Sequence, residues 1–218
     1  MIRLAIFDFC DTLVNFQTAN EFCKYVLKKE TRYRLLRVDH FFEKYYFYRL
    51  FARLRFSGFS QKKLLLRGLQ GISKSKIEFY GEQYVEDVIE NQLNITVFER
   101  FNEHKKSGDI VVINSGGYEA YLLKFSEKNK IEFTFSTKFK YINDVFTGEI
   151  EGNDCLGMEK VTRMKEAAFL DKVYEDIFVY SDSITDMPIF NLASQKIAVI
   201  KQKNTPNWCQ SNFEIIRT

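Results

Sequence analysis

Four short stretches of this chain combine residue types that can bind and transfer a phosphoryl group: residues 8–12 (DFCDT), 114–117 (NSGG), 155–160 (CLGMEK) and 181–186 (SDSITD). A carboxylate at the end of a strand can attack phosphorus, while a nearby hydroxyl and glycine amides hold the phosphoryl oxygens. A lysine would neutralise the charge that develops, and further carboxylates would hold a hard, oxygen-seeking ion such as Mg²⁺. Because phosphoryl transfer depends mostly on positioning and electrostatics, these stretches predict a phosphoryl-transfer site.

The elements that must position these residues are short apolar strands alternating with helical patterns. We expect buried strands at residues 2–7, 109–113, 131–135, 176–180 and 197–200, a β-hairpin at 138–150, and helices at 119–128, 159–169 and 186–193. This alternation predicts an α/β fold, a Rossmann-like parallel sheet with helices on both faces. In such sheets ligands bind outside the carboxyl ends of the strands, where Asp8, Ser115 and Asp182 all fall.

Residues 18–95 break this alternation, because they show long helical periodicity and no convincing strand. We therefore expect an α/β core formed by residues 1–17 and 96–218, with an all-helical cap of residues 18–95 inserted after the first strand. Within it, residues 21–80 hold 15 Lys and Arg against five Asp and Glu, although the whole chain has a net charge of only +3. The acidic residues must therefore concentrate in the core, where a metal would lie.

The inserted segment also holds a basic aromatic run at residues 40–56, for which three interpretations stay open. In the first, its aromatic side chains pack against neighbouring helices and its charges face water. In the second, the segment faces the substrate, and Lys63 or Arg67 reaches an anionic substrate across the cleft. In the third, which we do not favour, an interfacial helix contacts a membrane surface through Phe41, Phe42, Tyr45, Tyr46 and Phe51.

The composition excludes several broad classes of protein. An apolar share of 45% with 28% charged residues indicates a globular core and excludes a disordered chain. The net charge of +3 gives no argument for a nucleic-acid partner, and nothing in the sequence indicates an oligomeric state. We expect no transmembrane helix and no signal peptide, since no apolar window is long enough and the N-terminus lacks the required layout. The four cysteines form no CxxC pair, so we expect reduced thiols in a cytoplasmic protein.

In this order, the four stretches resemble the motifs of the haloacid dehalogenase superfamily of aspartate-nucleophile phosphatases, and specifically its phosphoserine-phosphatase-like branch. The first family motif, Asp-x-Asp-x-Thr, corresponds to residues 8–12, and the second, a Ser or Thr after an apolar strand, to Ser115. Lys160 matches the third motif, and Asp182 with Asp186 matches the acidic pair of the fourth. The resemblance covers nearly the whole chain and has the helical insertion where this branch carries its cap.

The resemblance implies Mg²⁺-dependent hydrolysis of a phosphate monoester and a role for each matched residue. Asp8 would be the nucleophile that forms an aspartyl-phosphate and also a Mg²⁺ ligand, with Asp182 as the second side-chain ligand. The backbone carbonyl of Cys10 would also bind the metal, and Asp186 would act near it through water or Lys160. The residues implied to hold the phosphoryl group are Thr12, Ser115, Gly116 and Lys160.

One departure from the family pattern concerns proton transfer. Where the family has a second acid, two residues after the nucleophile, this chain has Cys10. In the family that acid protonates the leaving alcohol and then activates water, and losing such help costs about 10²- to 10⁴-fold in rate. A thiol with an ordinary pKa of about 8.5 is a poor substitute. Either the adjacent Asp11 takes over this role, or the enzyme is slow on alkyl phosphates, or its leaving group needs no acid.

A second departure concerns the substrate. In phosphoserine phosphatase a glutamate about nine residues after the nucleophile meets the substrate's ammonium, whereas the neutral Gln17 stands there in this chain. Phosphoserine is therefore a poor first guess, and we expect a small or medium anionic phosphorylated substrate. Two other classes stay open. One is a phosphate-ligand binding or regulatory protein whose catalysis faded with Cys10, and the other is a phosphotransferase or a hydrolase of activated phosphates on the same site.

Overall fold

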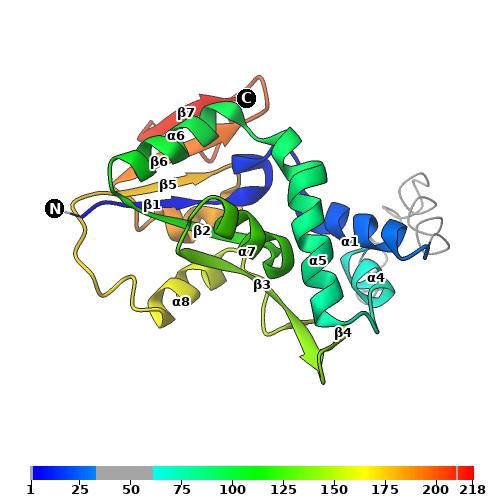
Figure 1. Cartoon of the computed structure of the whole chain (residues 1–218). Coiled ribbons are helices and arrows are strands. Elements are labelled where there is room, and N and C mark those ends of the chain that lie inside the picture. The colour runs from blue at the N-terminus through cyan, green and yellow to red at the C-terminus, as the bar shows by residue number, and fades with distance from the viewer. Residues whose placement is uncertain (1, 33–60, 210) are drawn as a thin grey trace, which may run out of the picture.

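The computed structural model describes residues 2–32, 61–209 and 211–218, and a seven-stranded sheet forms its centre (Figure 1). The strand order is β4-β3-β2-β1-β5-β6-β7. Every neighbouring pair is parallel except β3 and β4, which form an antiparallel hairpin. The strands are β1 (Leu4–Phe7), β2 (Ile110–Tyr118), β3 (Phe133–Ile142), β4 (Val145–Glu151), β5 (Ile177–Ser181), β6 (Gln195–Ile200) and β7 (Phe213–Arg217).

The observed sheet confirms the predicted α/β fold and differs from the expectation at two strands. The expected strand at residues 131–135 and the first arm of the expected hairpin are one continuous strand, β3, which pairs with β2 in its first half and with β4 in its second. Strand β7 has no counterpart among the predicted strands. Only Phe213 and Ile216 of its five residues are buried, because it lies at the edge of the sheet, and its sequence therefore shows no apolar run.

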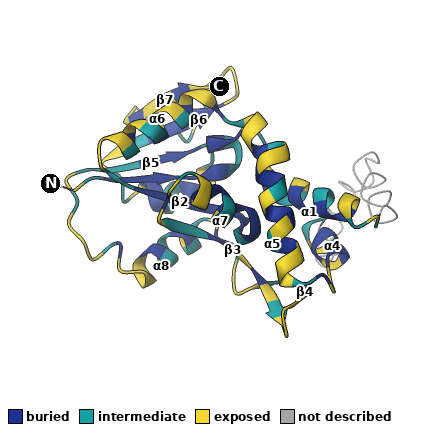
Figure 2. Cartoon of the chain, viewed as in Figure 1, coloured by how far each residue is buried: buried dark blue, intermediate teal, exposed yellow. Residues whose placement is uncertain are grey.

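Helices cover both faces of the sheet (Figure 2), and the sheet separates the hydrophobic core into two clusters, one on each face. One face, which includes Ala5 and Phe7, packs against α6 and α7, and the other, which includes Leu4 and Ile6, packs against α8 and α9. Because β1 is buried on both faces, all four of its residues are apolar. The elements are η1 (Phe9–Leu13), α6 (Ile95–Lys106), α7 (Glu119–Lys128), α8 (Met158–Glu166), η4 (Ile184–Asp186) and α9 (Met187–Phe190).

Between η1 and α6 the described residues are helical. The elements there are α1 (Thr18–Lys29), α4 (Gln61–Gly68), α5 (Lys74–Tyr84), η2 (Val85–Ile89) and η3 (Glu90–Gln92). Helix α5 approaches α7 so closely that a Cβ added at Gly81 would lie 1.9 Å from the carbonyl oxygen of Ala120, which only glycine permits. Within the described part of the chain, no helix is both long and apolar enough to cross a membrane. The aromatic run at 40–56, and with it the interfacial helix expected from Phe41, Phe42, Tyr45, Tyr46 and Phe51, lies outside the described residues.

Candidate active site

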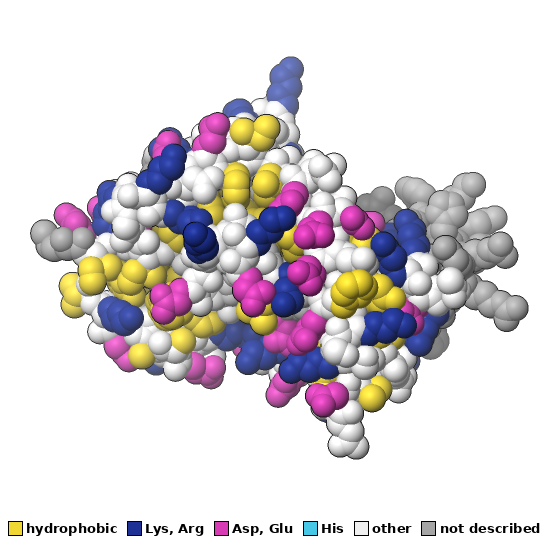
Figure 3. All heavy atoms as spheres, in the orientation of Figure 1, with side chains coloured by type: hydrophobic (Ala, Val, Ile, Leu, Met, Phe, Trp, Pro, Cys, Tyr) yellow, Lys and Arg dark blue, Asp and Glu magenta, His cyan; other side chains and the backbone are white. Residues whose placement is uncertain are grey.

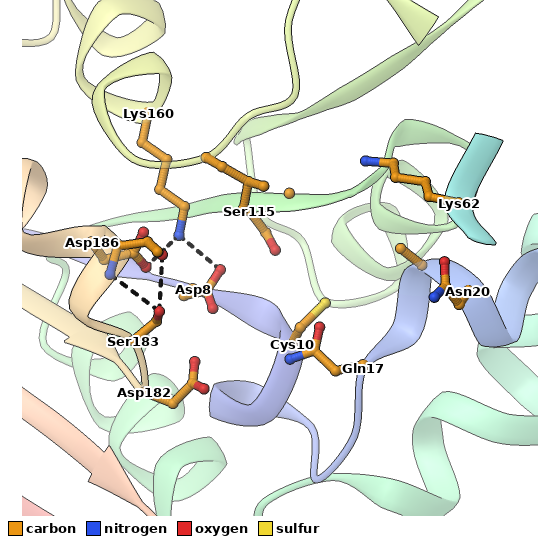
Figure 4. A pocket seen from close by; sticks show the side chains of 14 residues that line it. Asp8, Cys10, Gln17, Asn20, Lys62, Ser115, Lys160, Asp182, Ser183 and Asp186 are labelled. Carbon is orange, nitrogen blue, oxygen red and sulfur yellow. Dashed lines mark hydrogen bonds and ion pairs between the residues drawn. The ribbon is translucent and has the colours of Figure 1, made fainter. Parts of the chain in front are cut away.

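A cavity of about 380 Å³ lies beside the carboxyl ends of β1 and β5 and the second half of β2 (Figure 4). The predicted site residues that line it are Asp8, Cys10, Gln17, Ser115, Gly116, Lys160, Asp182 and Asp186. Lining residues that the sequence analysis did not identify are Ala19, Asn20, Lys62, Leu156, Ser183 and Thr185. Residues as far apart in the sequence as Asp8 and Asp186 therefore meet in one cavity, near the carboxyl ends of the strands.

Asp8 directly follows the buried strand β1 and begins the tight turn η1. Its backbone amide donates to the carbonyl oxygen of Tyr180 at 2.9 Å, which continues the pairing of β1 with β5. Inside the turn Asp11 has a φ of 54°, in the left-handed region that aspartate tolerates better than most residues. The turn leaves Asp8 only 8% exposed at the wall of the cavity.

Lys160 is the central cation of the site. Its ammonium, on the buried side of α8, donates to Asp8 Oδ1 at 2.9 Å and to Asp186 Oδ2 at 2.6 Å. Burial alone would lower the pKa of Lys160, but the two carboxylates outweigh it, so the pKa is raised and the lysine stays charged. Asp186 Oδ2 also accepts a hydrogen bond from Ser181 Oγ at 2.5 Å. Lys160 therefore fixes the orientation of Asp8 and links it to Asp186.

The carboxylates of the cavity carry more negative charge than this lysine balances. Burial raises the pKa of Asp8, and Asp186 raises it further, against the opposing effect of Lys160. Burial, followed by the charges of Asp8 and Asp11, raises the pKa of Asp182 to about 7. A cation bound between these groups would remove the repulsion and return them to their ionised forms.

The oxygen donors present fit Mg²⁺. Among the residues described, no group of three or more His, Cys, Asp and Glu side chains has the arrangement of a metal cage. Mg²⁺ does not require one, because proteins usually offer it one or two carboxylates and leave the other positions to water and substrate phosphate. Asp8 and Asp182 supply such carboxylates, and Asp186 Oδ1 is buried without a hydrogen-bond partner. Oxygen-only donors beside an unbalanced negative charge suit a hard divalent cation.

The side of the cavity where the sequence predicts phosphoryl binding comes from the irregular second half of β2. Ser115 is fully buried, and its hydroxyl accepts from the amide of Gly117 at 3.3 Å. A Cβ at Gly116 would lie 2.5 Å from the end of the Leu156 side chain, so a larger residue there would require this exposed leucine to move. Thr12, expected to hold phosphate, instead donates its hydroxyl to Asp182 Oδ1 at 3.3 Å and does not line the cavity. This hydrogen bond from Thr12 orients the carboxylate of Asp182.

Cys10 lines the cavity in the place where the family has an acid. Its Sγ lies 2.9 Å from Thr18 Oγ1, and Thr18 Oγ1 lies 2.6 Å from Tyr121 Oη, so three hydroxyl and thiol groups form one chain. Burial, and then the charge of Asp8, raises the pKa of the Cys10 thiol to about 11. The thiol is therefore protonated at neutral pH and offers no base to activate water.

Asp11 does not take the place of the missing acid. Its carboxylate is ion-paired with Lys201 and accepts a hydrogen bond from the side-chain amide of Gln17. It is not among the residues that line the cavity. Lys201 also donates to the carbonyl oxygen of Asn15 at 2.6 Å, which holds this ion pair outside the site.

The lysine of α4 that lines the cavity is not one of the two residues that the sequence predicted. Lys63 and Arg67 are exposed on α4 and do not line the cavity, whereas Lys62 does. Helical periodicity alone cannot distinguish neighbouring lysines on a helix whose docking direction is unknown. Asn20 carried a clearer signal, because it lies three residues after Gln17, one turn along the same face at the start of α1.

Comparison with known proteins agrees with this geometry. The family model of haloacid dehalogenase-like hydrolases matches residues 5–191. The phosphoserine phosphatase of Methanocaldococcus jannaschii is 24% identical over 207 residues, covering 92% of this chain and 89% of that protein. The histidinol-phosphatase of Neisseria meningitidis serogroup C is 26% identical over 228 residues, covering 98% of this chain and 100% of that protein.

Solved structures share the fold. A protein of unknown function from Bordetella pertussis superposes with a TM-score of 0.74 at 20% identity, covering 91% of this chain and 90% of that chain. A phospho-aspartyl intermediate analogue of phosphoserine phosphatase superposes with a TM-score of 0.57 at 21% identity, covering 91% and 86%. These likenesses establish the architecture that holds the four motifs together.

Proposed function

Since this chain belongs to the haloacid dehalogenase-like hydrolase family, we propose that it is a Mg²⁺-dependent phosphate monoester hydrolase that works through an aspartyl-phosphate on Asp8. The observation that carries this proposal is the buried ammonium of Lys160, which bridges Asp8 at 2.9 Å and Asp186 at 2.6 Å beside Ser115 and Asp182. A buried lysine held between two carboxylates at the cavity wall can position a nucleophile and neutralise a phosphoryl group.

The reaction has two half-reactions. In the first, an Asp8 carboxylate oxygen attacks phosphorus, the bond from phosphorus to the leaving oxygen breaks, and the leaving group takes up a proton. In the second, water attacks the aspartyl-phosphate, which releases inorganic phosphate and restores Asp8. Lys160 orients Asp8, while the Ser115 hydroxyl and the Gly116 amide hold the phosphoryl oxygens.

Asp8, Asp182 and the backbone carbonyl of Cys10 would hold the Mg²⁺ ion, which supplies charge neutralisation of the phosphoryl group when bound. Asp186 keeps Lys160 in place and offers its unpartnered oxygen toward the same region. That the related phosphoserine phosphatase has been captured as a phospho-aspartyl intermediate analogue supports the same chemistry here.

Cys10 limits which leaving groups this site can expel. The protonated thiol hydrogen-bonds to Thr18, and Asp11 is ion-paired with Lys201, so neither residue supplies the carboxylate that shuttles protons. These two contacts favour a second candidate function on the same site, which is the turnover or transfer of activated phosphates whose leaving groups need no acid. If dephosphorylation is slow enough, the protein would act mainly as a phosphate-ligand binding or regulatory protein.

We further propose that residues 18–95 form a helical cap over a core of residues 1–17 and 96–218. Lys62, Asn20 and Ala19 reach the cavity from this segment, whereas the residues proposed to hold the phosphoryl group come from β2 and α8 of the core. Closure of such a cap over a small or medium anionic substrate would exclude bulk water between the half-reactions. On the face drawn in Figure 3, Lys and Arg are interspersed with Asp and Glu.

A reducing cytoplasm suits this site, because oxidation of Cys10 would place a bulky acid beside the nucleophile.

The function is tested with a phosphatase panel in Mg²⁺, run on the wild type and on Cys10→Asp together, with Asp8→Asn as the inactive control. We expect measurable wild-type turnover of aryl and acyl phosphates and none in Asp8→Asn. Unchanged turnover in Asp8→Asn would refute the mechanism.

A further inference from the structure

The two ends of the cavity differ in charge. Of the described lining residues, the acids Asp8 and Asp186 pair with Lys160 at the phosphoryl end, and Asp182 lines the same end. In Figure 4 the other end, where the leaving group would lie, is bordered by the amides of Gln17 and Asn20 and by Lys62. No acidic side chain among the residues described lines that end. A substrate ammonium would therefore face a cation and two neutral amides.

Lys62 is built into this end of the cavity. It lies near the start of α4, and Figure 4 shows its ammonium pointing into the cavity, across from Lys160. The side chain is 28% exposed, and the ammonium lies 5.5 Å from the centre of the Tyr118 ring. An ion pair with Asp154, itself 32% exposed, holds it in this position. The cation is thus partly desolvated and pre-positioned, which strengthens its attraction for an anion.

The ion pair with Asp154 shows what kind of group Lys62 binds. Asp154 is a carboxylate, it lies on the loop between β4 and α8, and it does not itself line the cavity. Its Oδ1 is also 3.4 Å from the hydroxyl of Thr137, which donates to the carbonyl oxygen of Gly116 at 3.0 Å. This network connects Lys62 to the second half of β2, which would hold the phosphoryl group. An anionic group of a substrate can join or replace Asp154 on the cavity side of the ammonium.

Resting on the proposed function, we propose that the natural substrate is a phosphate monoester whose alcohol moiety carries a second anionic group, and that Lys62 binds this group. The amides of Gln17 and Asn20 suit neutral hydroxyl or carbonyl oxygens of the same moiety. Esters of amino alcohols are disfavoured, because among the described residues that line the cavity the only carboxylates are those of the proposed metal-binding set. Lys62 is then a specificity-determining residue, and it touches the part of the substrate that does not react.

Binding to Asp8→Asn protein tests this directly, because that variant keeps the cavity but cannot be phosphorylated. Titration calorimetry in Mg²⁺ compares four probes of similar length: carboxymethyl phosphate, ethylene bisphosphate, 2-hydroxyethyl phosphate and 2-aminoethyl phosphate. We expect one or both of the doubly anionic probes to bind roughly 10- to 100-fold more tightly than 2-hydroxyethyl phosphate, as for hydrogen bonds to charged groups. The bisphosphate and carboxylate arms distinguish a second phosphate from a carboxylate as the recognised group.

Three further substitutions in this background assign the preference to Lys62. Lys62→Met should remove the 10- to 100-fold advantage, Lys62→Glu should favour 2-aminoethyl phosphate, and Asp154→Asn should tighten anion binding by releasing Lys62. Lys63→Met, one position along the same helix but outside the cavity, should keep the preference. Unchanged affinity for inorganic phosphate in each variant shows that the site remains folded.

The inference is overturned if neither doubly anionic probe binds more tightly than 2-hydroxyethyl phosphate. It is also overturned if Lys62→Met retains the preference or if Lys63→Met abolishes it. Turnover of 4-nitrophenyl phosphate by the wild type reports on the proposed hydrolase activity separately. Failed turnover together with a Lys62-dependent preference would refute the hydrolase activity but not the binding of a second anionic group by Lys62. Turnover without that preference would support the hydrolase activity and refute this role of Lys62.

Discussion

Replacing Cys10 with aspartate should convert a slow site into an efficient alkyl phosphatase. The Sγ of Cys10 lies 2.9 Å from Thr18, at the wall of the cavity beside Asp8, so a carboxylate in its place can accept from the Thr18 hydroxyl and face the leaving oxygen. The thiol itself has a pKa of about 11, so at pH 7 about one molecule in 10⁴ carries a thiolate that can act as a base.

The size of the gain follows from what the substitution supplies. General acid and base catalysis contributes about 10²- to 10⁴-fold, equivalent to about 3–5.5 kcal/mol of transition-state stabilisation. The charge of Asp8 should raise the pKa of the new carboxyl as it raises that of the thiol, which brings the pKa nearer the working pH. Asp11 should not interfere, because Lys201 keeps it outside the cavity.

Rapid-quench kinetics with an alkyl and an aryl phosphate measures this effect. For the wild type we expect a burst of 4-nitrophenol followed by slow turnover, because dephosphorylation of Asp8 lacks a base. Cys10→Asp should abolish the burst and raise steady-state turnover of the alkyl ester. Cys10→Asn should do neither, because asparagine has the shape of aspartate but cannot act as a general acid or base. Equal rates for the aspartate and asparagine variants, or wild-type turnover of alkyl esters as fast as that of Cys10→Asp, would refute the reasoning.

Three other substitutions test the electrostatics and packing of the site. Since the pKa of Asp182 is raised to about 7 from its ordinary value, its contribution to stability is full below about pH 4 and is lost as the pH rises through about 7. Asp182→Asn should therefore stabilise the Mg²⁺-free protein by about 2–4 kcal/mol at about pH 8, and less at about pH 5. It should also remove the rise in melting temperature on adding Mg²⁺, and calorimetry that finds that rise intact would contradict Asp182 as a ligand. Lys160→Met should cost about 3–5 kcal/mol in urea unfolding at neutral pH, because it leaves two buried carboxylates without their cation; a loss below 1 kcal/mol would argue against the observed pairing. Gly81→Ala should cost at least about 1–3 kcal/mol, because its Cβ would meet the Ala120 carbonyl oxygen, while Glu82→Ala on the exposed side of α5 serves as the control and should change little.

The sequence predicted the buried strands because buried parallel strands are continuous apolar runs. The runs before Asp8 and Ser181 end beside the cavity, as expected for ligand-binding residues at the carboxyl ends of strands, whereas the order of the strands in the sheet was not predicted. The edge strand β7 escaped detection because only Phe213 and Ile216 are buried and Glu214 and Arg217 interrupt its short apolar sequence. The apolar pattern of a strand reflects how its residues are buried, so the pattern is weak in a strand that is only partly buried.

The candidate site was predictable where motif residues follow strands, and less so where tertiary contacts decide. The roles expected of Asp8 and Lys160 agree with their observed pairing, and they stay proposals until tested by mutation. Thr12 turns its hydroxyl to Asp182, and Asp11 pairs with Lys201, which lies 190 residues further along the chain. No local pattern specifies such partners. The choice of Lys62 over Lys63 likewise depends on how α4 docks, which the sequence of one helix does not encode.

The central claim is that Asp8 becomes phosphorylated, and acid-quench peptide mass spectrometry tests it most directly. The protein is mixed with 4-nitrophenyl phosphate and Mg²⁺, quenched at short times and digested at low pH. We predict one added phosphoryl group on the peptide that contains Asp8, absent when Mg²⁺ is chelated and absent in Asp8→Asn. Turnover without that adduct, or an adduct on another residue that persists in Asp8→Asn, would contradict the account.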